Sequence, residues 1–266
     1  MKREWSVKGA MATLVLLTLG GCGSGEKPAG TVDASDSVIS RQPADVPVAR
    51  APIEIADAAH AKPGDWIALF DGKSLAGWTQ RGGKAQYLVE PGGVLLGRTV
   101  ANTPNSFLCT EATYRDFELE LEFKIDAGAN SGVQVRSESR SDYQSGRVHG
   151  YQIEIDPSER AWTAGLYDEG RRGWLVDLKN NPKARAAFRP LEWNLLRVVV
   201  VGDTFNTWLN GVPAVVDFHD SRTAEGFIAL QVHSVEKAKD GSTPTHEVRW
   251  RNVRLLPRSG PSKNPG

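Results

Sequence analysis

The residues best suited to chemistry lie at every second position of one short segment. Residues 151–156 read Tyr-Gln-Ile-Glu-Ile-Asp, so Gln152, Glu154 and Asp156 alternate with larger, less polar side chains. Because the side chains of a strand point alternately to its two faces, these three polar groups are expected on one face. A carboxylate such as Glu154 could remove a proton there, with Gln152 binding the substrate. The alternative is that the three side chains only form the solvated face of a sheet.

Two further groups could complete such a site. Arg136 ends an alternating segment at 131–136, and a nearby strand would let its planar guanidinium hold an oxygen atom with two hydrogen bonds. His233 ends an otherwise apolar segment at 227–233, in which Gln231 is expected to bind the substrate. An imidazole suits proton transfer near neutral pH, and in its neutral form it also binds divalent metals. A structural histidine at the end of a strand is the alternative.

An aromatic and basic segment follows at 161–175. Its residues Trp162, Tyr167 and Trp174 are separated by glycines and accompanied by Arg171. If this segment forms the rim of a groove, the aromatic rings could stack on a sugar while the arginine donates to hydroxyl groups. The alternative is that the two tryptophans pack the edge of the fold.

Strands must position these groups, and the sequence predicts many of them. Residues 117–125 alternate strictly between apolar side chains and charged ones, which is the period of a half-buried strand. The only helical turn is predicted at 181–188, where Asn181 could cap and Pro182 could occupy the first position. Short strands joined by turns, without alternating helices, predict an antiparallel sandwich. The other strands are predicted at 131–136, 151–156, 194–201, 205–209, 227–233 and 246–255.

The N-terminal residues 1–22 have the features of an export signal. Basic residues precede an apolar run at 11–19, which is too short to cross a bilayer. The sequence Leu-Gly-Gly-Cys then ends at Cys22 and resembles a bacterial lipobox, so Cys22 is expected to carry a lipid anchor in a membrane. Gly23 follows in place of a retaining Asp, which favours an outer-membrane lipoprotein facing the periplasm.

The composition of the rest of the chain indicates how it is divided into disordered segments and a folded domain. Residues 23–63 are rich in Ala, Pro, Asp and Ser and predict a disordered tether, and 259–266 predict a disordered tail. Residues 64–258 suffice for one β-rich domain. Lys plus Arg and Asp plus Glu are both 32, so nothing attracts the chain to nucleic acid. Cys109 is the only cysteine left beside Cys22, which excludes an internal disulfide and predicts a buried small apolar residue.

Seven short motifs occur in an order that resembles a known family. The chain is similar over about residues 65–257 to the 3-keto-disaccharide hydrolase family. The resemblance implies an all-β, concanavalin A-like jelly-roll sandwich of two antiparallel sheets with a concave face for a saccharide. The motifs are LFDGKSLAGW (69–78), NSGVQVR (130–136), GYQIEID (150–156), EWN (192–194), WLNG (208–211), GFIALQVH (226–233) and RWRNVR (249–254).

The resemblance also implies a substrate, a glycoside already oxidised to a ketone at C3. Such a ketone acidifies the proton at C2, so the glycosidic bond could leave by elimination and hydration, with net hydrolysis. Glu154 would then be the base, Arg136 would polarise the ketone, and His233 would protonate the leaving oxygen. A divalent metal held by Asp156 and His233 could also stabilise the enolate.

Two alternative functions stay open. The same fold with stacking tryptophans also serves carbohydrate-binding modules that are not enzymes. In addition, the spacing Glu-x-Asp-x-x-Glu at 154–159 resembles laminarinase-like glucanases, in which Glu154 would be the nucleophile and Glu159 the acid/base. Pro157 counts against this pair, because a proline favours the end of the strand before Glu159, and strict alternation places 159 on the face opposite 154.

Overall fold

The computed structural model describes residues 65–237 and 239–258. The expected signal peptide with Cys22, the tether at 23–63 and the tail at 259–266 lie outside these residues. No helix in the described part of the chain is long and apolar enough to cross a membrane.

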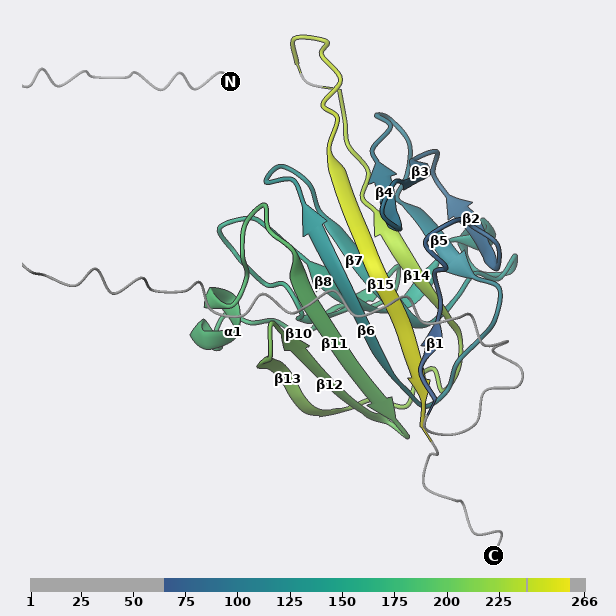
Figure 1. Ribbon diagram of the computed structural model, residues 1–266, viewed down its shortest axis with the longest axis vertical. Coiled ribbons are helices and arrows are strands. Elements are labelled where there is room, and N and C mark those ends of the chain that lie inside the picture. The colour runs from purple at the N-terminus through teal and green to yellow at the C-terminus, as the bar shows by residue number, and fades with distance from the viewer. Residues whose placement is uncertain (1–64, 238, 259–266) are drawn as a thin grey trace, which may run out of the picture. The chain divides into compact units, whose positions relative to one another are not determined.

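The larger sheet, sheet A, contains eight antiparallel strands. Seven of them follow the order β13-β12-β11-β6-β15-β4-β3, and β1 pairs with β15. Figure 1 shows β15, in yellow, crossing the middle of this sheet in front of β7, β8 and β14. The strands are β1 (Ile67–Ala68), β3 (Gln86–Glu90), β4 (Val94–Arg98), β6 (Phe117–Ile125), β11 (Asn194–Val201), β12 (Thr204–Leu209), β13 (Val212–His219) and β15 (Glu247–Pro257).

The second sheet, sheet B, has seven antiparallel strands in the order β10-β9-β8-β7-β14-β5-β2. The predicted antiparallel sandwich is therefore confirmed. The strands are β2 (Trp78–Gly82), β5 (Ser106–Thr110), β7 (Ser131–Glu138), β8 (His149–Ile155), β9 (Leu166–Glu169), β10 (Gly173–Val176) and β14 (Phe227–Val232).

Two short helical turns interrupt the strands. A 3-10 turn spans Gln144–Gly146, and α1 spans Pro182–Ala186. The Ala184 amide donates to the Asn181 side chain at 3.1 Å, and Pro182 stands at the first helical position. The cap satisfies an amide that has no partner inside the helix, as the sequence predicts.

The core lies between the inner faces of the two sheets. Leu119, Leu121 and Phe123 of β6 are fully buried, and so are Val133 of β7 and Ile153 of β8. Complete burial of one such side chain stabilises the fold by roughly 1.5–3 kcal/mol. In β6, β7 and β8 the apolar residues therefore face the core, and the polar residues that alternate with them lie on the outer face of each sheet.

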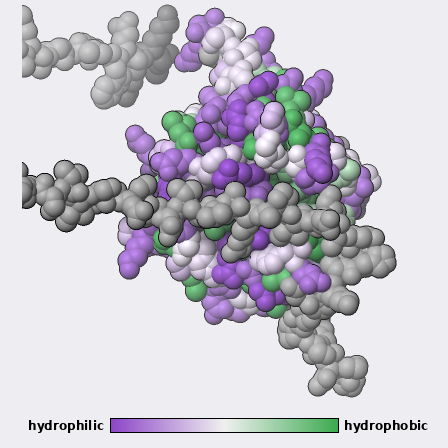
Figure 2. All heavy atoms as spheres, viewed as in Figure 1, coloured by the Kyte–Doolittle hydropathy of each residue, from purple (hydrophilic) through white to green (hydrophobic). Residues whose placement is uncertain are grey.

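The outer face of sheet A is occupied by ion pairs. Glu122 accepts from Arg251 at 2.6 Å, and Glu118 accepts from Arg197 at 2.5 Å. Although burial opposes it, the hydrogen bonds from Arg197 and Arg258 lower the pKa of Glu118. Figure 2 shows a mostly hydrophilic surface on the side viewed in Figure 1. These carboxylates are neutralised by arginines, which leaves sheet B to carry the candidate site.

Candidate functional site

The outer face of sheet B brings two of the predicted polar residues, Glu154 and Gln231, into one row. Strand pairing places Glu154 opposite Gly132, Gly132 opposite Gln231, Gln231 opposite Phe107, and Phe107 opposite Arg81. The row therefore crosses five strands, from β8 to β2. Gln231, predicted to bind substrate, is fully buried here, and within the described part of the chain neither atom of its amide has a hydrogen-bond partner. A buried amide without partners is rare and marks a place where a ligand could bind.

Glu154 is a buried carboxylate on this face, with 5% of its surface exposed. Its two oxygens accept hydrogen bonds from Asn130 Nδ2 at 2.8 Å and from Gln152 Nε2 at 2.9 Å. Burial raises the pKa of Glu154 above its ordinary value, and the two hydrogen bonds only partly offset that rise. The carboxyl group is therefore a stronger base than an exposed glutamate.

A chain of hydrogen bonds fixes the side chain of Gln152. Ser137 Oγ donates to Gln134 Oε1 at 2.6 Å, and Gln134 Nε2 donates to Gln152 Oε1 at 2.6 Å. Because the ionised carboxylate of Glu154 can only accept, both amides are held in one orientation. Gly132 makes this possible, since a Cβ atom there would lie 2.5 Å from Cδ of Gln152.

Asp156 has a structural task in the turn after β8. Its carboxylate accepts from Ser158 Oγ at 2.6 Å and from Arg160 Nε at 2.7 Å. These hydrogen bonds lower the pKa of Asp156 although burial opposes them. They also hold the Arg160 guanidinium 3.8 Å from the Glu154 carboxylate.

The suggested metal ligands do not form a matching donor set. Among residues 65–237 and 239–258, no group of three or more His, Cys, Asp or Glu side chains is arranged to hold a metal ion. Both oxygens of Asp156 already accept hydrogen bonds from the protein. The pair of Asp156 and His233 therefore does not fit the role of metal ligands.

His233 follows β14 directly and is half-buried. Its Nδ1 lies 2.9 Å from the carbonyl oxygen of Ser234. Because a carbonyl can only accept, Nδ1 carries the hydrogen and Nε2 of the neutral ring is left as an acceptor. Gln231 lies in the row that contains Glu154, and Val232 pairs with Ser131, so His233 lies two residues beyond that row.

Arg136 does not reach the candidate site, which corrects the sequence-based expectation. A bulge between Val135 and Glu138 breaks the alternation of β7, and Arg136 has a φ of 47°. Its guanidinium is buried and donates to Gly202 O at 2.7 Å and to Asp116 Oδ1 at 2.9 Å. The side chain thus braces the sandwich and is not free to polarise a substrate.

Arg171 is also turned away from Glu154, contrary to its expected role on the rim of a groove. It donates to Asp168 Oδ1 at 2.6 Å and to Thr223 Oγ1 at 2.8 Å. Its side chain is 7% exposed and lies over the ring of Tyr151, which belongs to the core. The turn from β9 to β10 therefore directs Arg171 to the buried Asp168 at the edge of the sandwich.

The three predicted aromatic residues do come together. Tyr167 pairs with Trp174 across β9 and β10, and their ring centroids are 5.3 Å apart. Trp162 meets Trp174 edge-on at 4.8 Å, and Tyr167 also pairs with Gln152. All three rings are half-buried, so they pack the sheet edge and still present aromatic surface beside the polar row.

The spacing of 154–159 does not produce a pair of facing carboxylates. β8 ends at Ile155, and Glu159 is exposed in the turn that follows, whereas Glu154 is buried on the sheet. A retaining glycosidase needs two carboxyl groups about 5 Å apart on one substrate. The arrangement does not favour a laminarinase-like mechanism.

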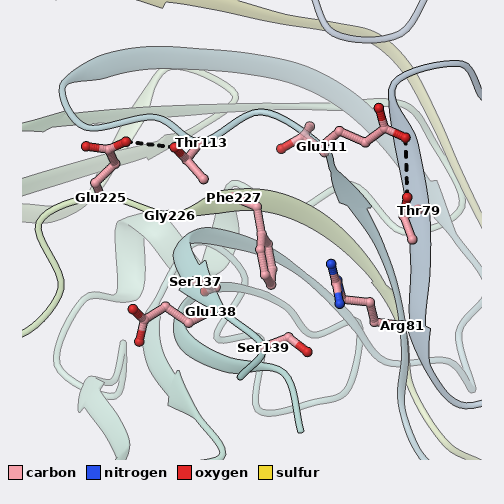
Figure 3. Close-up of a pocket in the computed structure, with 11 residues that line it drawn as sticks. Thr79, Arg81, Glu111, Thr113, Ser137, Glu138, Ser139, Glu225, Gly226 and Phe227 are labelled. Carbon is pink, nitrogen blue, oxygen red and sulfur yellow. Dashed lines mark hydrogen bonds between the residues drawn. The ribbon is translucent and has the colours of Figure 1, made fainter. Parts of the chain in front are cut away.

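An open groove of about 450 Å³ lies on the same face toward the other end of β7 and β14. Figure 3 shows Phe227 in its middle, with charged and hydroxyl side chains around it. Glu154 is not part of its lining. Among the residues that line it are Thr79, Arg81, Glu111, Glu138, Ser139 and Phe227.

Sequence reasoning missed three residues of this face. Asn130 and Gln134 stand inside the motif at 130–136, but nothing in that motif says that they support Glu154. Arg160 gave no signal at all, because only the turn after β8 brings it back to the carboxylate.

The fold and the polar face together define a carbohydrate-related β-sandwich with a galectin-like architecture. The chain belongs to the family described as the 3-keto-alpha-glucoside-1,2-lyase-like domain, whose model matches residues 65–256. The family resemblance seen in the sequence motifs is thereby confirmed.

Two solved structures illustrate the shared fold. A candidate glycosyl hydrolase from Parabacteroides distasonis has a TM-score of 0.50 and 19% identity, with 73% of this chain and 94% of that chain covered. A Bacillus subtilis protein of unknown function with a galectin-like fold has a TM-score of 0.53 and 14% identity, with 74% and 99% covered. No curated protein matches the chain.

Proposed function

We propose that this domain cleaves 3-keto-glycosides by removing the proton at C2 of the oxidised ring, with Glu154 as the base. The observation that carries the proposal is the buried Glu154 carboxyl, whose pKa is raised and whose two oxygens are held by Asn130 and Gln152. Membership of the 3-keto-alpha-glucoside-1,2-lyase-like family supports a keto sugar as substrate.

The proposed reaction is an elimination. Glu154 takes the C2 proton, and the electron pair of that bond forms an enolate with the ketone at C3. The ketone then re-forms as the C1–O bond breaks. The electron pair of the C1–O bond leaves with the glycosidic oxygen, which takes up a proton. The products are an unsaturated keto sugar and an alcohol, and addition of water to the former gives net hydrolysis.

Other residues of the face would serve this reaction. The unpartnered amide of Gln231 offers an N–H group that can stabilise the enolate oxygen. When its Nε2 is protonated, His233 can deliver a proton to the leaving oxygen, and Trp162, Tyr167 and Trp174 supply aromatic surface for the sugar. The chain of hydrogen bonds through Gln134 holds the amide of Gln152 against Glu154 during the proton transfer.

The direct test is incubation of the purified protein with a 3-keto-disaccharide, with and without a chelator, while released sugar is measured. We expect release by the natural protein and none by Glu154→Gln, which should still bind the disaccharide. Absence of release across a broad panel of 3-keto-glycosides would overturn the proposal, and inhibition by the chelator would show that a metal takes part.

A non-catalytic carbohydrate-binding module is the second candidate. The open groove favours it, because its aromatic and hydroxyl lining does not include Glu154. Such a module would bind oligosaccharides and would release no sugar in any variant.

We also propose that the protein works as a lipoprotein anchored at Cys22, in the outer membrane and facing the periplasm. This rests on residues 1–23, where an apolar run precedes Leu-Gly-Gly-Cys and Gly23 follows in place of a retaining Asp. Mass spectrometry should detect acylation at Cys22, and Cys22→Ala should move the protein to the soluble fraction. A chain that remains unacylated in its own host would contradict the anchor.

A further inference from the structure

We propose that the groove beside Phe227 is a second saccharide site, which binds neutral sugar rings beyond the one that is cleaved. The inference rests on the proposed function for its link to Glu154. The binding itself does not require that function.

The groove and Glu154 share one face but are separated across the sheet. Arg81 of the groove lies in the same row as Glu154 but four strands away from it. At about 4.8 Å per strand this corresponds to roughly 19 Å. The separation is longer than one pyranose ring, so different rings of one oligosaccharide would occupy the two places.

The lining of the groove matches the two kinds of surface on a sugar ring. Phe227 is 8% exposed and offers C–H groups a small aromatic surface. Thr79, Arg81 and Ser139 lie around it, and in Figure 3 the Arg81 side chain extends toward Phe227. The rest of the lining is mostly polar, and its hydroxyl, carboxylate and guanidinium groups can pair with the hydroxyl groups of a sugar.

The charges of the groove select a neutral, hydroxyl-rich ligand. Glu111, Glu138 and Glu225 line it together with the single guanidinium of Arg81. Arg115 lies 3.5 Å from Glu225 and Arg140 lies 3.9 Å from Glu138, so the charges balance and the groove offers an anionic sugar no net attraction, whereas each carboxylate can still accept hydrogen bonds from hydroxyl groups. The chemistry therefore favours a neutral oligosaccharide over a uronic acid or a phosphorylated sugar.

Protein contacts already hold these carboxylates in place. Thr113 Oγ1 donates to Glu225 at 2.7 Å, and Glu138 Oε2 lies 3.4 Å from His149 Nε2. The other nitrogen of His149 lies 2.8 Å from the carbonyl oxygen of Arg147, which fixes the ring. Acceptors that are ordered before the ligand arrives lose less conformational entropy on binding.

The test uses unoxidised tetrasaccharides, which need no turnover. The protein is titrated calorimetrically with maltotetraose, cellotetraose and laminaritetraose, and Arg81→Ala and Glu138→Gln are compared with Arg189→Ala. Arg189 is exposed and lies outside the groove lining. We expect at least one tetrasaccharide to bind, and Arg81→Ala to weaken it about ten-fold, as expected for a hydrogen bond to a charged group. Glu138→Gln should weaken it several-fold, and Arg189→Ala should leave it unchanged.

The outcomes separate this proposal from the catalytic one. Binding that survives in Glu154→Gln, together with absence of turnover in the natural protein, contradicts cleavage and supports the groove. The proposal of a second saccharide site is overturned if the protein cleaves a 3-keto-glycoside but binds no tetrasaccharide. It is also overturned if binding is the same in Arg81→Ala, Glu138→Gln and the natural protein. A further expected sign is a higher KM of Arg81→Ala for a 3-keto-trisaccharide, with an unchanged KM for a methyl 3-keto-glycoside.

Discussion

Replacement of Glu154 by Gln removes the proposed base and keeps the shape of its surroundings. The new amide can still accept from Gln152, and Asn130 can turn its own amide to accept from the new N–H group. The substitution thus leaves no buried polar group unpaired, so we expect the variant to fold. General-base catalysis contributes about 10²–10⁴-fold, and kcat should fall by that factor. This loss corresponds to roughly 3–5.5 kcal/mol of transition-state stabilisation.

The assay measures sugar release from a 3-keto-disaccharide and, separately, the binding of the same compound by calorimetry. Glu159→Gln is the matched control, because Glu159 is an exposed carboxylate in the next turn. We expect Glu154→Gln to bind normally and to lose turnover, and Glu159→Gln to keep both binding and turnover. Turnover above about a tenth of the natural rate in a folded Glu154→Gln would refute Glu154 as the base. Equal loss in both variants would instead indicate a glycosidase with two carboxylates.

Three further predictions concern the same face and its support. Because burial raises the pKa of Glu154, the rate should rise with pH and level off only above the ordinary pKa of a glutamate, and a rate profile already flat at pH 4.5 would contradict this. The raised pKa in the folded state also means that the contribution of Glu154 to stability is lost as pH rises through that raised pKa. Gly132→Ala should displace Gln152 and lower kcat with little change in the melting temperature, and unchanged kinetics would show that the alignment is unimportant. Arg136→Ala should lower the free energy of unfolding by about 3–5 kcal/mol in a denaturant titration, because Asp116 loses its ion pair and the carbonyl groups of Arg115 and Gly202 lose their donor, and a loss below about 1 kcal/mol would refute the bracing role.

Local patterns predicted the strands because their cause is local. In 117–125 the alternation of apolar and charged residues can bury one face only as an extended strand, and β6 spans those residues. The same holds for β8, whose polar residues Gln152 and Glu154 share the outer face as expected. Likewise, Asn181 and Pro182 predicted α1 through capping chemistry that involves only the next few residues.

The same rule failed at Arg136, for a reason outside its own segment. Strict alternation puts Arg136 on the face of Gln134, but β7 bulges there against Gly226. A Cβ atom on Gly226 would lie 2.4 Å from the carbonyl oxygen of Ser137, so the bulge depends on a glycine far along the chain. No pattern within 131–136 contains that information.

The order of the motifs was enough to establish the fold class and the family, and the alternation of Gln152 and Glu154 was enough to predict a base, because side chains two residues apart share one face of a strand. Tertiary structure alone decided the surroundings of that base. Asn130 and Arg160 meet at Glu154 only after β8 and the next turn have folded. The groove likewise joins Arg81 of β2 and Phe227 of β14, whose proximity follows from sheet pairing between distant strands.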